Sequence, residues 1–280
     1  MAPILVVGSP RSGTTAIALG LSAAGISGYS EGHFLMLFVR IEQAITKYYH
    51  DEAKNNVPGT LLHALPMGQI AEDYRRMARL TVDAAHDGNA WFDKTAHGGM
   101  IGCLPFMRAL WPDAKIIFAK RRPIENIESR LRKFPHMSFA EHCADLKYIF
   151  NTWSAMRENL ENWLEVDQYD LITEPVRTAK AISRFLKLDS GAESAFLGTI
   201  LNTYPEKTAS SYTPKRFSEL NWSQMDKSDF AADFDSLMKQ FGYDYENYYA
   251  REEAFTATRA FRPGCEADAD RKSESALLRT

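Results

Sequence analysis

The sequence predicts an α/β protein with three layers, in which a parallel β-sheet is covered by helices on both faces. Three observations lead to this fold class. Short apolar runs alternate with segments of helical periodicity, which is typical of strand–helix–strand units and parallel sheets. The 280 residues are 45% apolar and 25% charged, as in globular proteins. A loop with two glycines joins the first apolar run to the first helical segment, as a tight turn requires.

In the first half of the chain, the apolar run Ile-Leu-Val-Val predicts a buried first strand. The helix that follows is expected to end at Gly25, since glycine commonly ends helices. The later segments are assigned from their apolar spacing, which repeats every three to four residues in helices. The expected strands are 4–8, 28–30 and 90–93. The expected helices are 14–24, 34–49, 69–85 and 100–110.

In the second half, A-K-I-I-F-A-K predicts a strand, and Pro123 suits the first position of the helix that follows. Ser138 and Glu141 have the spacing of a capping box, which marks a helix start. Behind them, apolar residues from Phe139 to Trp163 recur every three or four positions and predict one long amphipathic helix. The expected strands are 114–120 and 169–173. The expected helices are 123–133, 139–163, 175–186, 192–201 and 228–241.

The organisation and composition exclude several classes of protein. We expect one domain over residues 1–250, followed by a charged C-terminal tail over 251–280. The net charge of −3 argues against a nucleic-acid binder, and no apolar run is long enough to span a bilayer. Three widely spaced cysteines exclude a disulfide framework. The apolar start is too short for a secretory signal, so we expect a cytoplasmic protein.

The most informative segment is Gly8-Ser-Pro-Arg-Ser-Gly-Thr-Thr15, which follows the first strand and opens the first helix. Such a turn directs backbone N–H groups and the positive helix end at one point, which suits an anion. The spacing resembles an ATP-binding P-loop, but Thr14 stands where those enzymes have lysine. The basic residue here is Arg11, inside the loop. The loop therefore suits a 5′-phosphate better than a triphosphate, and a turn without ligand is the alternative.

A second anion site is expected where the 114–120 strand ends. Arg121 leaves the strand at its carboxyl end, where ligands of open α/β sheets bind. Ser129 lies about two helical turns into the next helix, so both side chains can meet one phosphate. The segment 120–133 is unusually basic for an acidic protein. The alternative interpretation is a charged, solvent-exposed helix face.

Together these motifs resemble the PAPS-dependent sulfotransferases of the Golgi and bacterial type (PAPS is 3′-phosphoadenosine-5′-phosphosulfate). The resemblance spans about residues 4–222 and implies a three-layer, P-loop-like fold. It also implies a reaction that needs no metal and leaves PAP (3′-phosphoadenosine 5′-phosphate) as its product. It implies that the loop residues hold the 5′-phosphosulfate; these are Pro10, Arg11, Ser12, Gly13, Thr14 and Thr15. It also implies that Arg121, Pro123 and Ser129, in an R-x-P-x-x-x-x-x-S pattern, form the 3′-phosphate site.

Weaker matches to the same family supply candidates for catalysis. The segment 25–34 resembles the family segment that carries a glutamate base, which favours Glu31, and His33 is the rival base because its ordinary pKa lies near neutrality. Phe92-Asp-Lys-Thr95 resembles the strand end whose lysine assists catalysis, here Lys94, although Ala96 replaces the usual proline. Arg11 would assist Lys94 in stabilising the leaving group. The segment 210–216 resembles a late loop that closes over the nucleotide, so Lys215 or Arg216 could reach the 3′-phosphate.

The sequence thus predicts a sulfotransferase that uses PAPS as co-substrate and no metal. Its acceptor is a hydroxyl-bearing small molecule, sugar or lipid, and residues 34–88 are expected to form much of the acceptor wall. Two other functions stay open at this stage. A P-loop small-molecule kinase or other phosphotransferase is disfavoured by the missing lysine after Gly13. A non-catalytic nucleotide sensor is disfavoured by the presence of Glu31, Lys94 and Arg11. The oligomeric state is open.

Overall fold

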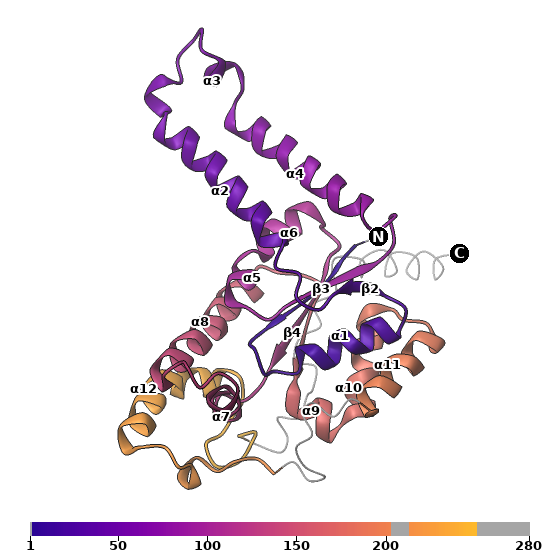
Figure 1. Ribbon diagram of the computed structural model, residues 1–280, viewed down its shortest axis with the longest axis vertical. Coiled ribbons are helices and arrows are strands. Elements are labelled where there is room, and N and C mark those ends of the chain that lie inside the picture. Colours follow the sequence, from indigo (N-terminus) through magenta and orange to yellow (C-terminus); the bar gives the residue numbers. More distant parts are fainter. Residues whose placement is uncertain (1, 203–212, 251–280) are drawn as a thin grey trace, which may run out of the picture.

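The computed structural model describes residues 2–202 and 213–250, within which five parallel strands form one sheet (Figure 1). The strands are β1 (Ile4–Gly8), β2 (Ser27–Tyr29), β3 (Trp91–Thr95), β4 (Lys115–Lys120) and β5 (Trp163–Asp167). Their order in the sheet is β2-β3-β1-β4-β5, so β1 lies at the centre. Every pairing between neighbours is parallel, and their carboxyl ends therefore lie along one edge.

Helices lie on both faces of the sheet, which confirms the three-layer α/β architecture. The helices are α1 (Thr14–Ala23), α2 (Leu35–Asp51), α3 (Leu61–Ala64), α4 (Met67–Ala84), α5 (Gly98–Gly102), α6 (Leu104–Leu110), α7 (Pro123–Lys133), α8 (Phe139–Arg157), α9 (Gln168–Thr173), α10 (Pro175–Leu186), α11 (Ser190–Asn202) and α12 (Gln224–Gln240). Two 3₁₀ turns in the described part of the chain lie at Ala53–Asn55 and Phe217–Glu219.

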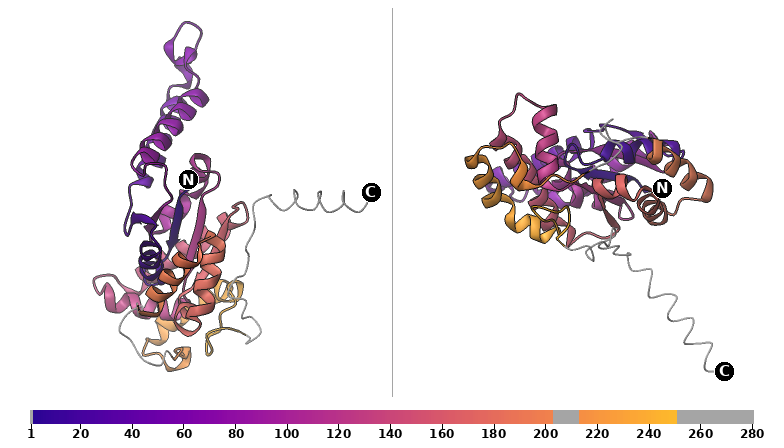
Figure 2. Two further views of the ribbon diagram at one scale, coloured as in Figure 1. Left: turned by 90° about the vertical axis from the view of Figure 1, so that its right-hand side faces the viewer. Right: turned by 90° about the horizontal axis from the view of Figure 1, so that it is seen from below.

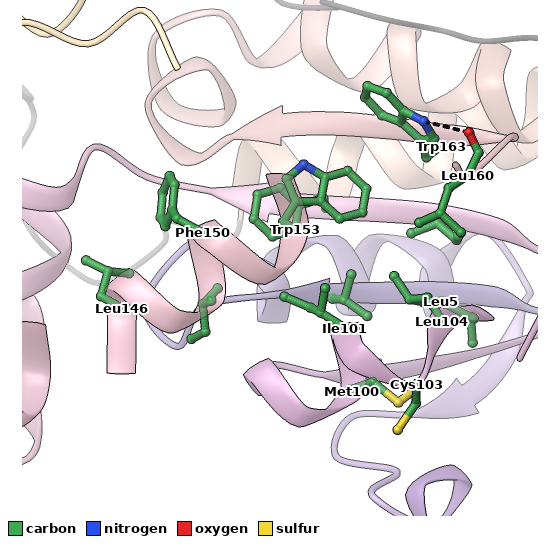
Figure 3. Packing of buried hydrophobic residues seen from close by; sticks show 14 of the residues in the cluster. Leu5, Met100, Ile101, Cys103, Leu104, Leu146, Phe150, Trp153, Leu160 and Trp163 are labelled. Carbon is green, nitrogen blue, oxygen red and sulfur yellow. Dashed lines mark hydrogen bonds between the residues drawn. The ribbon is translucent and has the colours of Figure 1, made fainter. Parts of the chain in front are cut away.

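The core consists of two clusters, one on each face of the sheet. Alternate residues of β1 enter different clusters: Leu5 and Val7 pack with α5, α6, α8 and α12, whereas Ile4 and Val6 pack with α1, α10 and α11. Figure 3 shows the first cluster, where Leu5 lies near Ile101 and Leu104 and where Trp153 stands over the sheet. This alternation follows from the two-residue period of a strand that is buried on both sides.

Helices α2, α3 and α4 form an arm that projects away from the sheet (Figures 1 and 2). Its two long helices are antiparallel and meet through Phe38 and Tyr74, whose hydroxyl donates a hydrogen bond to the Phe38 carbonyl oxygen at 2.9 Å. The buried residues of α4 recur at helical spacing on one side: Ala71, Tyr74, Ala78 and Val82. Much of the remaining arm surface faces solvent. No helix in residues 2–202 or 213–250 is long and apolar enough to cross a membrane.

Three sequence-based expectations were wrong. The expected strand 169–173 falls on helix α9, and the strand of this region is β5, six residues earlier. The long amphipathic helix ends at Arg157. Trp163 fits the apolar spacing of that helix but lies in β5, which is why the sequence predicts a helix that is too long. The helix expected over 100–110 is two helices, since Pro105 begins α6 at its first turn. The expected C-terminal tail, 251–280, lies outside the described residues.

Candidate active site

The glycine-bearing loop leaves the central strand β1 and enters α1 at the carboxyl edge of the sheet. Gly8 has a φ of 145°, and a Cβ there would lie 2.1 Å from the Ala119 carbonyl oxygen. Gly13 is the N-cap of α1 in the left-handed region, and Arg11 adopts a left-handed φ of 73°. Only glycine fits the first position. The loop is thereby held against β4, with the positive end of α1 at its exit.

Helix α7 is bound to this loop by Asn126, which the sequence analysis did not single out. Its side-chain amide donates hydrogen bonds to the Ser9 and Ser12 hydroxyls at 2.7 and 3.1 Å, and to the Pro10 carbonyl oxygen at 3.1 Å. The two serine hydroxyls are 2.5 Å apart. Asn126 is fully buried, so the loop and α7 form one rigid unit. An asparagine inside a helix gave no sequence signal, because its partners are more than 100 residues away.

The two predicted anion motifs meet directly. The Arg11 guanidinium donates a hydrogen bond from Nε to the Ser129 hydroxyl at 3.1 Å. Arg121 donates from Nη1 to the Arg11 carbonyl oxygen at 3.2 Å, so its side chain points to the loop. Burial and the neighbouring Arg121 and Arg132 guanidinium groups lower the pKa of Arg11. Three arginines crowded together create a positive potential that favours an anion.

The basic segment 120–133 is not a solvent-exposed helix face, so that alternative is wrong. Several of its cations are buried and paired with carboxylates that fix the structure. Lys120 lies 3.2 Å from Glu165, Arg130 lies 2.7 Å from Asp145, and the buried Arg122 forms an ion pair with Glu125. Arg121 instead donates a hydrogen bond to a carbonyl oxygen of the loop, that of Arg11. The tertiary structure therefore separates structural arginines from the one that faces the loop.

The catalytic candidates Glu31, His33 and Lys94 also come together, beside β3. The buried Lys94 ammonium forms an ion pair with the Glu31 carboxylate, which is half exposed. His33 Nε2 lies 3.4 Å from the other Glu31 oxygen, and the His33 amide donates to the Thr95 hydroxyl at 3.2 Å. In the sheet register, Lys94 pairs with Val6 and Thr95 with Val7, immediately before Gly8. The cluster therefore shares an edge of the sheet with the glycine-bearing loop.

Asp93, to which the sequence motif assigns no role, supports this cluster. Its carboxylate is buried and accepts a hydrogen bond from the Thr95 hydroxyl at 2.7 Å. Burial raises the pKa of Asp93, and the Thr95 hydrogen bond opposes that rise. A Cβ on Gly32 would lie 1.4 Å from the Asp93 carboxylate, so the 31–33 loop packs directly on it. Asp93 and Thr95 therefore position the loop that carries Glu31 and His33.

Other candidates are placed beside the site with partners of their own. The Lys215 ammonium lies 2.5 Å from Glu128, next to Ser129, and its backbone N–H donates to Glu125. Arg216 is mostly exposed and lies 3.4 Å from Glu219. His97 accepts a hydrogen bond from the Gly99 N–H and thereby caps α5. Residues 210–212 of the late loop lie outside the described residues. Within the described residues, no cluster of His, Cys, Asp and Glu could hold a metal ion.

This arrangement can hold two anionic groups close together, next to an ammonium, a carboxylate and an imidazole. Such a site can bind a phosphate-bearing donor, transfer a group from it and take up a proton.

Comparisons with known proteins also indicate an enzyme that transfers a group. A model described as "Sulfotransferase family" matches residues 3–191, which include both anion motifs, Glu31, His33 and Lys94. Among solved structures, the chain is similar to the sulfotransferase STF9 of Mycobacterium avium, with 15% identity and a TM-score of 0.51 over 88% of this chain and 78% of that chain. It is also similar to a sulfotransferase domain from the curacin biosynthetic pathway, with 15% identity and a TM-score of 0.50 over 84% and 97%. No curated protein matches the sequence.

Proposed function

The chain belongs to the sulfotransferase family, and we propose that it transfers a sulfuryl group from PAPS to a hydroxyl group of its acceptor. The observation that carries the choice of donor is the contact between the two anion motifs, in which Arg11 meets both Ser129 and Arg121. PAPS carries phosphates at the 3′ and 5′ positions of a single ribose. Its two binding sites must therefore be close neighbours, as these two motifs are.

In this proposal the loop amides, Ser12, Thr14 and Thr15 hold the 5′-phosphate at the start of α1. Arg121 and Ser129 hold the 3′-phosphate, and Arg11 lies between the two groups. The residues fit the donor because burial and the neighbouring Arg121 and Arg132 guanidinium groups lower the pKa of Arg11, and a bound phosphate would neutralise these positive charges. Lys215 would join the 3′-phosphate site by exchanging Glu128 for the phosphate.

PAPS, when bound, supplies an activated sulfuryl group on its 5′-phosphate. Glu31 or His33 takes the proton of the acceptor hydroxyl as the new sulfur–oxygen bond forms. Lys94 and Arg11 stabilise the negative charge on the bridging phosphate oxygen, which keeps the electron pair of the broken sulfur–oxygen bond. Asp93 and Thr95 keep the 31–33 loop in place beside β3. Each charge that changes in the transfer thus has a partner at the edge of the sheet.

The pairing of Glu31 with Lys94 favours Glu31 as the base. Lys94 is fixed in β3, whereas Glu31 lies in a loop and is half exposed, so it can contact both Lys94 and an acceptor. His33 touches the remaining Glu31 oxygen and can orient the carboxylate. The imidazole is exposed as well, and His33 therefore stays the second candidate.

The donor assignment is tested by calorimetry with PAP and AMP, which differ in the 3′-phosphate. We expect PAP to bind without Mg²⁺. Arg121→Ala should weaken PAP about 10- to 100-fold, since a hydrogen bond to a charged group contributes about 1.5–3 kcal/mol. AMP affinity should change less than about threefold, because AMP lacks the group that Arg121 is proposed to hold. Arg76→Ala, an exposed arginine of the arm, is the matched control.

Equal losses for PAP and AMP would remove Arg121 from the 3′-phosphate site. Absence of PAP binding to the unaltered protein, together with Mg²⁺-dependent turnover of ATP, would replace the proposal by a phosphotransferase.

A further inference from the structure

A row of exposed apolar side chains begins directly after the proposed catalytic loop. Phe34 follows His33, and Leu37, Ile41 and Tyr48 follow at helical spacing along α2. Each of these four side chains is between 38% and 59% exposed. Ala44 continues the same spacing and is also exposed. Exposed apolar groups that are scattered singly need no explanation, whereas a continuous row indicates a surface that another molecule covers.

Helix α4 adds a second row on the same side of the arm. In α2 the exposed residues Phe34 and Leu37 each precede a buried residue, Leu35 and Phe38. In α4 the exposed Met77 likewise precedes the buried Ala78. Residues displaced by the same angle from the contact between two antiparallel helices lie on the same side of the pair. Met77 therefore lies on the same side as the α2 row.

We define the apolar face of the arm by its large side chains, which are Phe34, Leu37, Ile41, Tyr48, Met77 and Leu80. Leu80 lies one helical turn after Met77 and is 62% exposed. The exposed Arg40 lies one helical turn after Leu37 and marks an edge of this face. The arm's charged side chains include pairs with one another, such as Arg75 with Glu42 and Arg79 with Asp83. A continuous row of large exposed apolar side chains suits an apolar partner.

The position of the face decides between its possible occupants. It starts at Phe34, beside Glu31 and His33, and runs along α2 to Tyr48 for about 21 Å at 1.5 Å per residue. A surface used only for pairing two copies of the chain has no physical reason to begin at the catalytic loop. An acceptor that has its hydroxyl at Glu31 and an apolar tail would need such a surface to begin there.

We propose that the acceptor is an amphiphile, whose hydroxyl head lies at Glu31, His33 and Lys94 and whose apolar tail lies along the apolar face of the arm. This proposal rests on the proposed sulfotransferase function and specifies its substrate class. The tail supplies binding energy by covering exposed apolar side chains, and the head presents the hydroxyl to the base.

The experiment measures affinity against tail length. Butyl, hexyl, octyl and decyl glucosides, each below its critical micelle concentration, are titrated by calorimetry into the full chain saturated with PAP. A fully buried methylene changes an equilibrium constant about fourfold. Because the face covers the tail on one side only, we expect at least about a tenfold gain from butyl to decyl. The same series, with labelled PAPS, reports whether KM follows the affinity.

Two variants place the tail on the arm. Ile41→Gln and Met77→Gln replace exposed side chains with glutamine, which is a good helix former, so folding should be preserved. Together they should remove most of the dependence on tail length and leave PAP affinity unchanged. Met225→Gln is the matched control, since Met225 is 71% exposed on α12 and lies outside the face. It should leave the tail-length dependence as in the unaltered chain.

The outcomes separate this inference from the proposed function. If PAP binds but glucoside affinity is independent of tail length, the amphiphile inference is wrong and the sulfotransferase function stands. If PAP does not bind, the proposed function is wrong, and the glucoside series without PAP still reports on the face. If sedimentation shows a dimer that Ile41→Gln and Met77→Gln dissociate, the face is covered by a second copy and the inference is overturned.

Discussion

Lys94 and Glu31 form an ion pair whose members differ in burial, and this difference favours separate roles for them in the proposed transfer. The Lys94 side chain is 5% exposed and that of Glu31 is 53% exposed. A buried ammonium needs a counter-charge, and the removal of that counter-charge is costly. Glu31 provides it in the structure. We expect a leaving-group oxygen to take over this task when the donor is bound, which would release the carboxylate to accept a proton.

At the residue scale, the base is identified by two conservative variants. Glu31→Gln keeps the shape of the side chain and removes its basicity, so kcat should fall about 10²- to 10⁴-fold, the usual range for loss of a general base. His33→Asn suits the left-handed backbone of residue 33 and should lower kcat less than about tenfold. PAP affinity, measured by calorimetry, should be unchanged in both. A larger loss in His33→Asn than in Glu31→Gln would make His33 the base.

At the scale of elements, the glycine-bearing loop is fixed by what surrounds it. β4 closes against Gly8, α9 packs against Gly13, and α7 is bound through Asn126. Because three elements hold the loop, its backbone has the same conformation before a ligand binds. Such preorganisation lowers the cost of binding a phosphate.

Substitutions at two glycines with positive φ distinguish the cost of backbone strain from the cost of a steric clash. Gly8→Ala places a Cβ 2.1 Å from a backbone oxygen of β4, whereas Gly25→Ala meets nothing within 4 Å. Gly25→Ala should lower the free energy of unfolding by about 1–2 kcal/mol, the cost of a left-handed conformation for a residue with a Cβ. Gly8→Ala should cost more than about 4 kcal/mol or prevent folding. Urea denaturation followed by circular dichroism measures both, and equal losses would show that the close approach at Gly8 can relax.

At the scale of the whole molecule, the last described segment is fastened to the sheet by buried polar groups. Asp167 at the end of β5 accepts hydrogen bonds from the Tyr243 and Tyr248 hydroxyls at 2.5 and 2.6 Å. The Tyr249 hydroxyl donates to Asp170 at 2.9 Å. The buried Arg122 donates to the Asp244 carbonyl oxygen at 2.8 Å. Residues 243–249 therefore close the molecule against the same edge that carries the site.

These contacts give a pH dependence of stability. Burial and the nearby Asp167 charge raise the pKa of Asp170 to about 7. The folded protein thus holds a proton here that the unfolded chain releases near pH 4, so this contribution to stability is present below pH 4 and is lost as pH rises to about 7. Asp170→Asn imitates the protonated form. Its free energy of unfolding, relative to the unaltered protein, should therefore rise from pH 5 to pH 8. A difference that is constant with pH would contradict the raised pKa.

The sequence by itself determined the α/β class and most element positions, and it predicts both anion motifs, because these depend on local spacing. The apolar runs 4–7 and 116–119 mark the strands β1 and β4, and Gly8, Arg11 and Gly13 mark the loop. The local pattern failed at 157–173, where Trp163 fits the helical spacing of α8 but lies in β5, since a buried strand and a buried helix face use the same residues.

Only the tertiary structure decided which polar residues act together. Asn126 reaches the loop, Asp93 supports the 31–33 loop, and Arg121 is distinguished from the buried ion pair of Arg122 by partners far away in the chain. The side of the arm that carries its apolar face also follows from the packing of α2 on α4. The physical reason is that a side chain's partners are fixed by the approach of strands and helices across the fold, which no local spacing records.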